Sequence, residues 1–244
     1  MLEGLYSAAA GMSAQQEQLN AISNDLANVS TSGYKAERVA FSDLLYNPVD
    51  IAGTDTSAGS GASARVIGRS EAQGSIQETG EPLDLAIEGP GYFQVKRANG
   101  KLALTREGNF GVDASGALVN AEGNRLSPPI KLPKGTSPSE VRIAPDGTVT
   151  AGTRKLGQIK LVTVTSPEHL LADGGGELTP TKESGAPHAA KGRIHQGALE
   201  ASNVNIAGEM ALMASTQRNY QMMSTAIQTE SQMMSIANQL RASS

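Results

Sequence analysis

Cysteine and tryptophan are absent from this chain of 244 residues, which contains only three Phe and five Tyr. Without cysteine the chain forms no disulfide, no thiolate metal site and no thiol nucleophile. The shortage of aromatic rings makes any core aliphatic and argues against a stacking platform for nucleic-acid bases. The charged residues, 20 basic and 24 acidic, include no basic run, so nucleic acid is not expected as a partner.

The sequence pattern also shows no secretory signal and no membrane span. The first basic residue is Lys35, and residues 1–34 hold no apolar run of signal-peptide length. No apolar run in the chain reaches the ~18–20 residues that cross a bilayer. We therefore expect no membrane insertion, and any export must depend on another signal.

Apolar residues recur every seven positions at the N-terminal end, which predicts a helix over about residues 3–29. Small polar residues and Gly33 follow, and these are typical of a helix end. One apolar row is Leu5, Met12, Leu19 and Leu26, and the other is Met1, Ala8, Ile22 and Val29, with Gln15 interrupting it.

The same spacing at the other end predicts a second helix, for which Asn203 or Asn205 would be the N-cap. Its apolar row is Ile206, Met213, Tyr220, Ile227 and Met234. Six of the eight Met residues lie between residues 210 and 234. We interpret them as packing residues of a helix interface, because a thioether metal site would need a supporting His or Cys cluster.

The two helices are expected to pair, but their outer faces are unusual for a coiled coil in water. Those faces carry Ala, Ser, Asn, Gln and Thr where Glu and Lys are typical. Small uncharged side chains allow close approach without burying ions. We therefore expect other copies of the helices to pack around the pair. The predicted helix-packing residues are Leu5, Met12, Leu19, Ile22, Leu26, Val29, Ile206, Met213, Tyr220, Ile227 and Met234.

Between the helices the apolar period changes to two, which predicts antiparallel β-strands near residues 83–87, 93–95 and 159–164. Residues 53–64 and 172–192 are expected to be loops. Four dipeptides predict turns: Asn99-Gly100, Ser115-Gly116, Glu122-Gly123 and Asp146-Gly147. The predicted fold class is α+β, with coiled-coil helices at 1–34 and 198–244, a linker and extended loop segment at 35–80, and a central β-rich domain at 81–197.

No catalytic, cofactor-binding or metal site is expected. The three histidines, His169, His188 and His195, lie in no metal-binding motif and are predicted to be on the surface. A nucleophile elbow and a phosphate-binding loop are absent from the sequence. A glycosidase pair is disfavoured because the aromatic lining for a sugar is missing and hairpin carboxylates are usually solvated. Its candidate carboxylates are Asp84, Glu88, Glu107 and Asp113.

Three blocks of the sequence resemble the bacterial flagellar rod and hook family. Residues 24–35 (NDLANVSTSGYK) resemble its N-terminal signature, 84–95 (DLAIEGPGYFQV) with 104–123 its central block, and 197–210 (GALEASNVNIAGEM) with 217–234 its C-terminal block. The blocks occur in the family's order. The matching positions are Asn24, Leu26, Ala27, Asn28, Gly33, Tyr34, Gly89, Gly91, Phe93, Ser202, Asn203, Val204, Glu209, Gln217, Arg218 and Tyr220.

The resemblance implies a non-enzymatic structural subunit that the flagellar type III apparatus exports unfolded, without a cleaved signal. The terminal helices would form the inner coiled-coil layer of a hollow, helical shaft that transmits torque, and the β domain its outer tube. The implied partners are further copies of the chain, other rod and hook proteins, the export apparatus and the surrounding ring proteins. The implied location is the basal body, outside the inner membrane in the periplasm and cell envelope, and no cofactor is implied.

Within the family, the length and the single central block resemble the rod members. Residues 41–47 (FSDLLYN) resemble the segment that follows the first helix of distal rod members. A proximal rod member or another hook-basal body axial protein is the alternative. A wall hydrolase exported by the same route is a more remote one.

Overall fold

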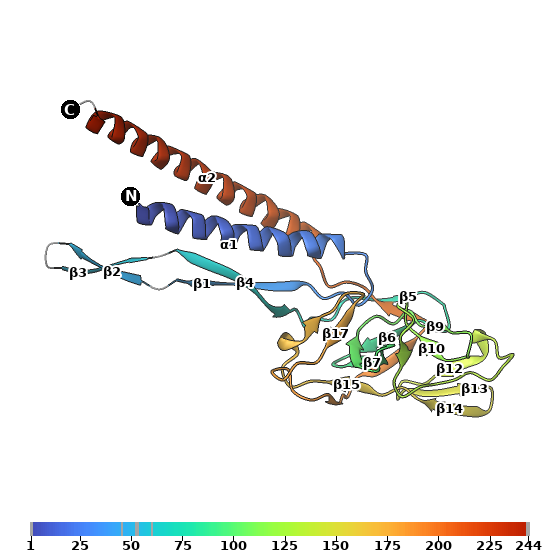
Figure 1. The fold of residues 1–244 in the computed structure, drawn as a ribbon. Coiled ribbons are helices and arrows are strands. Elements are labelled where there is room, and N and C mark those ends of the chain that lie inside the picture. Colours follow the sequence, from blue (N-terminus) through green and yellow to red (C-terminus); the bar gives the residue numbers. More distant parts are fainter. Residues whose placement is uncertain (1, 45, 52–53, 60, 243–244) are drawn as a thin grey trace. The chain divides into compact units, whose positions relative to one another are not determined.

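The computed structural model describes residues 2–44, 46–51, 54–59 and 61–242 (Figure 1). The chain forms two compact units. The helical unit comprises Met1–Leu26, Glu37–Ile67 and Asn205–Ser244, and the β unit comprises Ala27–Ala36 and Gly68–Val204. The α+β class is confirmed, whereas the stretch 35–80, expected to be a separate linker, is shared between the two units.

Two long helices of the helical unit, α1 (Leu2–Ala27) and α2 (Ile206–Ala242), run antiparallel and side by side (Figure 1). Just after α1, Thr31 N donates to Asn28 O at 3.0 Å, closing a turn. Asn205 rather than Asn203 caps α2, because its Oδ1 accepts from Gly208 N at 3.3 Å. Among the described residues, neither helix has the combination of length and apolar character that crossing a bilayer requires.

A strand hairpin completes the helical unit. Strand β1 (Glu37–Asp43) pairs with β4 (Ala62–Arg69), and β2 (Tyr46–Ile51) pairs antiparallel with β3 (Thr54–Gly59). The loop prediction for 53–64 was therefore wrong for residues 54–59 and 62–64, while 53 and 60 lie outside the described residues. Strand ladders use backbone groups that nearly every residue has, so pairing can override a Gly- and Ser-rich composition.

The β unit consists of short strands, and its strand pairings among the described residues are antiparallel, as predicted. The strands are β5 (Ile76–Glu78), β6 (Leu85–Glu88), β7 (Tyr92–Lys96), β8 (Leu102–Thr105), β9 (Gly111–Val112), β10 (Leu118–Val119), β11 (Arg125–Leu126), β12 (Val141–Ile143), β13 (Thr148–Ala151), β14 (Arg154–Gln158), β15 (Leu161–Thr163), β16 (Leu171–Ala172), β17 (Glu177–Thr179), β18 (His188–Ala189), β19 (Arg193–Gln196) and β20 (Ala198–Glu200). The main sheet has the order β16-β17-β8-β7-β11-β10-β9, with β15 joined to β7 and β18 to β15. Smaller sheets are β12-β13-β14, β19-β6 and β20-β5, and two short 3-10 helices cover Pro138–Glu140 and Pro167–His169.

The four predicted turn dipeptides all connect paired strands, so these predictions are confirmed. The glycine of each dipeptide has a positive φ, between 77° and 83°, which explains why glycine stands there. The predicted strand over 159–164 is broken, since β14 ends at Gln158 and β15 begins at Leu161. Between them, Ile159 N donates to Gly147 O at 2.7 Å instead of joining the ladder.

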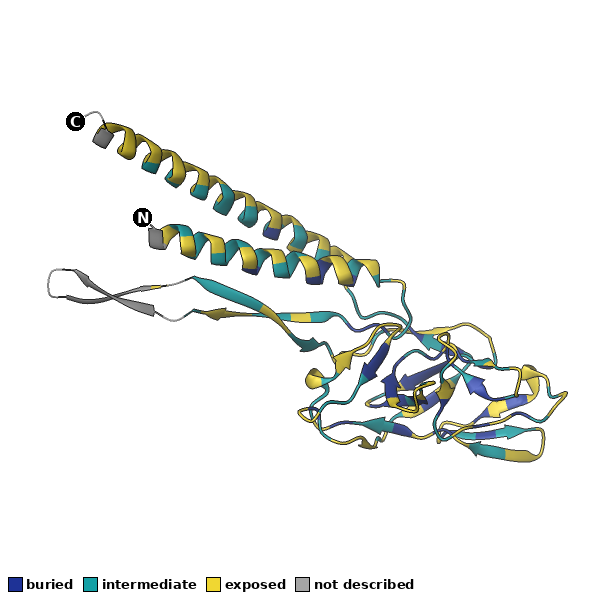
Figure 2. Cartoon of the chain, viewed as in Figure 1, coloured by how far each residue is buried: buried dark blue, intermediate teal, exposed yellow. Residues whose placement is uncertain are grey.

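The main hydrophobic core lies inside the β unit and is largely aliphatic, as the shortage of aromatic residues predicts. Figure 2 shows buried residues gathered among these strands, whereas the helices are mostly exposed or intermediate. Phe93 is fully buried and meets Phe110 edge to face, with ring centroids 5.1 Å apart. Phe93 is therefore a central packing residue of the β unit.

Replacing Phe93 with Ala should lower the free energy of unfolding of the β unit by about 3–5 kcal/mol, because it leaves a cavity in a close-packed core. Chemical denaturation measures the loss. The matched control is Leu102→Ala in β8, where the side chain is 43% exposed and the loss should be about 1 kcal/mol or less. Equal losses for the two variants would contradict the central position of Phe93.

Candidate assembly interface

Three residue pairs set the register between α1 and α2: Gly4 with Glu230, Gly11 with Met223, and Asp25 with Glu209. A Cβ added to Gly4 would lie 3.2 Å from Glu230 Oε2, and one added to Gly11 would lie 3.0 Å from Met223 Sδ. Successive pairs move equally far along the two helices in opposite directions. The helices are therefore antiparallel in one continuous register, with glycines where they approach closely.

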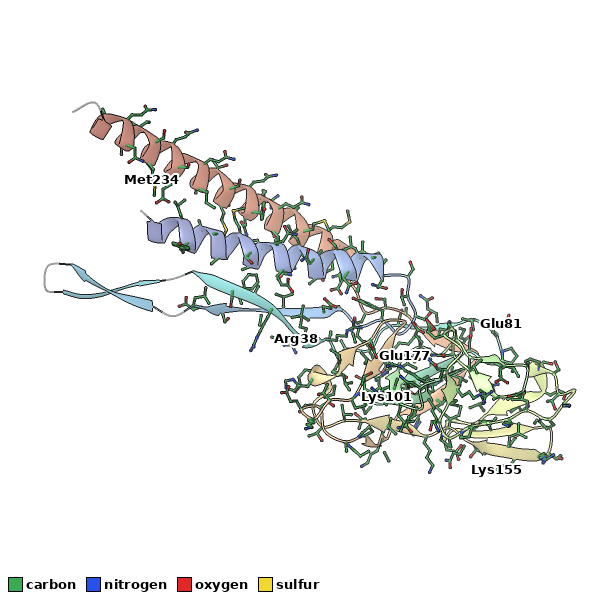
Figure 3. The ribbon with its side chains drawn as sticks, in the orientation of Figure 1. Arg38, Glu81, Lys101, Lys155, Glu177 and Met234 are labelled. Carbon is green, nitrogen blue, oxygen red and sulfur yellow. The ribbon has the colours of Figure 1, made fainter. Side chains whose placement is uncertain are left out.

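The inward face of α2 contains most of the row that the sequence predicts. Met213, Tyr220, Ile227 and Met234 are half-buried, and Figure 3 shows Met234 on the side of α2 toward α1. Ile206 is 50% exposed and does not share this burial. A second inward row was missed because it is mostly polar: Glu209, Thr216, Met223 and Glu230.

Thr216 shows why a polar residue is tolerated in that second row. Its side chain is almost fully buried, with a residue exposure of 2%. Its Oγ1 donates to Leu212 O at 2.8 Å, so the buried hydroxyl is satisfied within the helix. Hydrophobic periodicity does not detect such a position, since the residue type is polar although the site is buried.

Helix α1 is covered on two sides, and its most buried positions hold both small and large apolar residues. Ala14, Ala21 and Ile22 are at most 4% exposed. A Cβ at Gly61, beside β4, would lie 3.0 Å from Ala10 Cβ, so the hairpin also packs on α1. The predicted row of Leu5, Met12, Leu19 and Leu26 is half-buried, as is Val29, which lies beyond the end of the helix.

Large apolar side chains remain exposed on the other faces of both helices. Tyr6 is 73% exposed on α1, and Met222 and Leu240 are 63% and 66% exposed on α2. Met233 and Ile236 are also exposed, at 55% and 57%. Exposed apolar surface of this kind marks sites of protein association. One chain alone thus leaves its helix pair incompletely covered.

Polar contacts connect the last turn of α1 to β1. Asp25 is 2% exposed, and its Oδ1 and Oδ2 accept from Glu37 N at 3.0 and 3.2 Å. Asn24 Nδ2 donates to Glu37 Oε1 at 2.9 Å. On α2, burial and the nearby charge of Asp25 raise the pKa of Glu209. The family-like residue Asn24 and its neighbour Asp25 thus connect the start of the hairpin to the helix.

A buried carboxylate in the β unit gathers segments that are far apart in the sequence. Glu200 Oε1 accepts from Lys35 Nζ at 2.5 Å and from Gly74 N at 2.9 Å, while Oε2 accepts from Arg106 Nη1 at 2.9 Å. Its side chain is completely buried. Burial lowers the pKa of Lys35, and Glu200 counteracts that effect. Sequence reasoning missed this cluster, because no local spacing connects its members.

Several family-like residues lie around that cluster. Gly33 N donates to Glu200 O at 2.7 Å, and Gly33 has a φ of +71°. A Cβ there would lie 2.5 Å from the Arg106 carbonyl carbon, so only glycine fits. Asn203 Oδ1 accepts from Ala36 N at 2.8 Å, and its Nδ2 donates to Ala72 O at 2.8 Å.

The remaining family-like residues have varied positions. Gly89 and Gly91 both have positive φ, and Gly89 O accepts from Arg106 Nη2 at 2.9 Å. Ser202 Oγ accepts from Val204 N at 3.3 Å, and Asn28 Oδ1 accepts from Thr31 Oγ1 at 3.3 Å. Tyr34 is buried, Leu26 and Tyr220 are half-buried, and Ala27, Gln217 and Arg218 are exposed. The structure thus brings part of the motif together in the β unit and leaves other members on helix surfaces.

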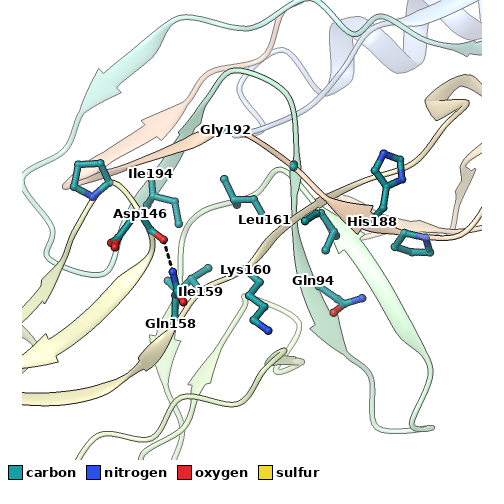
Figure 4. Close-up of a pocket in the computed structure, with 14 residues that line it drawn as sticks. Gln94, Asp146, Gln158, Ile159, Lys160, Leu161, His188, Gly192 and Ile194 are labelled. Atoms are coloured by element: carbon teal, nitrogen blue, oxygen red, sulfur yellow. Dashed lines mark hydrogen bonds between the residues drawn. The ribbon is translucent and has the colours of Figure 1, made fainter.

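A cleft of about 450 Å³ opens in the β unit between the β12–β13 turn and the chain around β15 and β18 (Figure 4). Its lining includes Asp146, Lys160 and His188. The Asp146 carboxylate already accepts from Thr148 N and Oγ1 at 2.9 and 3.0 Å, and these bonds lower its pKa. Asp146 therefore serves the turn, and the cleft shows no paired acid and base.

The histidines lie on the surface, and one of them, His195, meets the candidate carboxylate Glu88. His169, His188 and His195 are exposed, so their predicted surface positions are confirmed. Three of the four carboxylates have local partners: Asp84 accepts from Thr79, Glu88 pairs with His195, and Asp113 accepts from Ser115 and Arg125. Within the described residues, no group of three or more His, Cys, Asp or Glu side chains could hold a metal ion.

Comparison with known proteins identifies the family. Residues 5–35 match the model of the flagella basal body rod protein, 86–151 that of the flagellar hook protein FlgE/F/G D1 domain, and 195–240 that of the flagellar basal body rod FlgEFG protein C-terminal region. The flagellar basal-body rod protein FlgG of Borreliella burgdorferi is 35% identical, with 99% of each chain covered. That of Buchnera aphidicola is 35% identical over 98% of this chain and 100% of the relative. FlgF of Mesorhizobium japonicum is 30% identical over 91% of this chain and 90% of the relative.

These matches extend over nearly the whole chain and agree with the element order of the structure. The chain belongs to the flagellar basal-body rod protein family.

Replacing Glu200 with Gln should destabilise the β unit by about 3–5 kcal/mol, because Lys35 and Arg106 would remain buried without their anion. Denaturant titration of the purified chain measures this loss. Glu78→Gln is the matched control, since Glu78 is exposed in β5, the strand that pairs with β20. A Glu200 variant as stable as the control would show that the cluster does not support the fold.

Proposed function

We propose that this chain is the structural subunit of the distal rod, polymerising helically into a hollow shaft that transmits torque from motor to hook. The observation that carries the proposal is the uncovered apolar surface of the helix pair, where Tyr6, Met222 and Leu240 are each more than 60% exposed. Packing against further copies would remove this surface from water. The terminal helices would then form the inner layer of the shaft.

We further propose a coiled-coil arrangement of the terminal helices, which the spacing of their inward residues supports. The inward residues of α2 recur at alternating intervals of three and four positions, from Glu209 to Met234. This spacing is the heptad pattern, and the pairs Gly4–Glu230 and Gly11–Met223 are likewise seven residues apart. In the proposed shaft, the predicted rows of α1 and α2 provide contacts within a chain and between copies.

The distal position is supported by the relatives named FlgG, the distal rod member of the family. They match over nearly all of this chain, and FlgF matches less of it at lower identity. The family implies assembly with other rod and hook proteins and a location in the flagellum. We further propose export by the flagellar type III apparatus, contact with the surrounding ring proteins, and a role without catalysis.

Leu19→Asp tests the helix-packing role, since Leu19 is half-buried on α1 and a charge there should block packing between helices. The variant replaces the native chain in its own cells. Circular dichroism should show a folded β unit, while antibody labelling of purified hook-basal bodies should detect no variant in the shaft, and swimming should be lost. Leu19→Met at the same position should assemble and swim.

Two outcomes have distinct meanings. Normal incorporation of Leu19→Asp would contradict the helix-packing account but leave the rod position intact. Absence of label from the shaft in cells with the native chain would contradict the rod position itself. Label beside the hook supports the distal position, and label nearer the inner rings supports the proximal one.

A further inference from the structure

The carboxylates of Glu107 and Glu122 lie close to a turn of three glycines in the β unit. The turn, Gly174–Gly176, precedes β17, and its glycines have φ values of 84°, 55° and 64°. A Cβ at Gly175 would lie 2.7 Å from Glu122 Oε1, and one at Gly176 would overlap the Glu107 carboxylate. The absence of side chains on the turn is what allows both carboxylates to come so close.

A third glutamate holds the end of this turn in place. Glu177, labelled in Figure 3, follows the glycines and is 4% exposed. Its Oε1 accepts from Asn120 and Asn124 at 2.8 and 2.6 Å, and its Oε2 accepts from Arg97 Nε at 2.6 Å. These bonds fix the Glu177 carboxylate, so it cannot move away from a neighbouring charge.

Glu107 faces this fixed charge from the segment after β8. Its backbone N donates to Thr105 Oγ1 at 3.0 Å, which holds the main chain, and its side chain is half-buried. The charged groups that act on it are Glu122, from the turn between β10 and β11, and Glu177, from β17. The nearby cation Arg97 is engaged by Glu177 and Asp173. Burial, followed by these two carboxylates, raises the pKa of Glu107 to about 7.

We propose that Glu107 makes the Gly174–Gly176 turn sensitive to pH. The hydrogen bonds of the turn are kept when the Glu107 carboxyl group is protonated, and they weaken when it is ionised. When Glu107 is ionised, three carboxylates lie around the turn and repel one another. This repulsion is relieved when the side chain or backbone segment that is least firmly held moves away. The exposed Glu122 side chain and the glycine turn are the ones that can move, because the Glu177 carboxylate is held. The bonds that loosen are Glu177 N to Gly174 O, at 3.1 Å, and Thr105 Oγ1 to Gly176 O, at 2.9 Å.

The direction of the pH effect follows from proton linkage. The folded chain holds the Glu107 proton more tightly than the unfolded chain, in which the pKa is near 4.5. The stability contributed by the protonated group is therefore complete below pH 4.5 and is lost as the pH rises through about 7.

The test uses the full-length protein labelled with ¹³C at glutamate carboxyl carbons, together with amide hydrogen exchange. The Glu107 resonance should titrate with a midpoint near 7. Amides of Gly174–Glu177, corrected for intrinsic rates, should exchange roughly threefold faster or more at about pH 8 than at about pH 6. Glu107→Gln should abolish this difference, and Glu122→Gln should lower the Glu107 midpoint by removing one repelling charge.

Glu140→Gln is the matched control, because Glu140 is exposed at the end of a 3-10 helix and should leave both readouts as in the native chain. A Glu107 midpoint near 4.5 would overturn the proposal, and this measurement needs no variant. The proposal also fails if Glu107 titrates near 7 while exchange at the turn stays the same.

Discussion

The buried carboxylate of Glu200 is the contact on which the β unit depends. It joins Lys35, Gly74 and Arg106, which belong to three separate segments of the chain. Burying ions is costly unless every charge has a partner, so these segments stabilise one another only when all are in place. The cluster holds both the residues that follow α1 and those that precede α2. These residues belong to the β unit.

The helical unit is organised in a different way. The most buried residues of α1 are Ile22, Asp25, Ala14 and Ala21, and glycines stand where α2 approaches. The two helices approach each other closely at these glycines, while large apolar side chains such as Met222 remain exposed. In the proposed shaft, such a unit would gain stabilisation by packing against further copies of the chain. The β unit, in contrast, contains its own hydrophobic core.

Predictions from the sequence succeeded where a pattern is local. The Asn99-Gly100 turn was predicted from neighbouring residues, and it connects β7 with β8. They failed where burial and residue type disagree, as at Thr216, whose hydroxyl is satisfied inside its own helix. The segment 54–59 was mistaken for a loop, because its strand depends on pairing with 46–51 rather than on its own composition.

Periodicity, turn dipeptides and motif blocks thus establish the helices, the β-rich middle and the family from the chain alone, since each is a property of residues close together in sequence. The tertiary structure decides the rest. Glu200 lies 165 residues from Lys35 and 94 from Arg106, and Glu107 acquires its raised pKa from burial and from the charges of Glu122 and Glu177. These contacts have no local signature, because burial and charge interactions act across space between segments that only folding brings together.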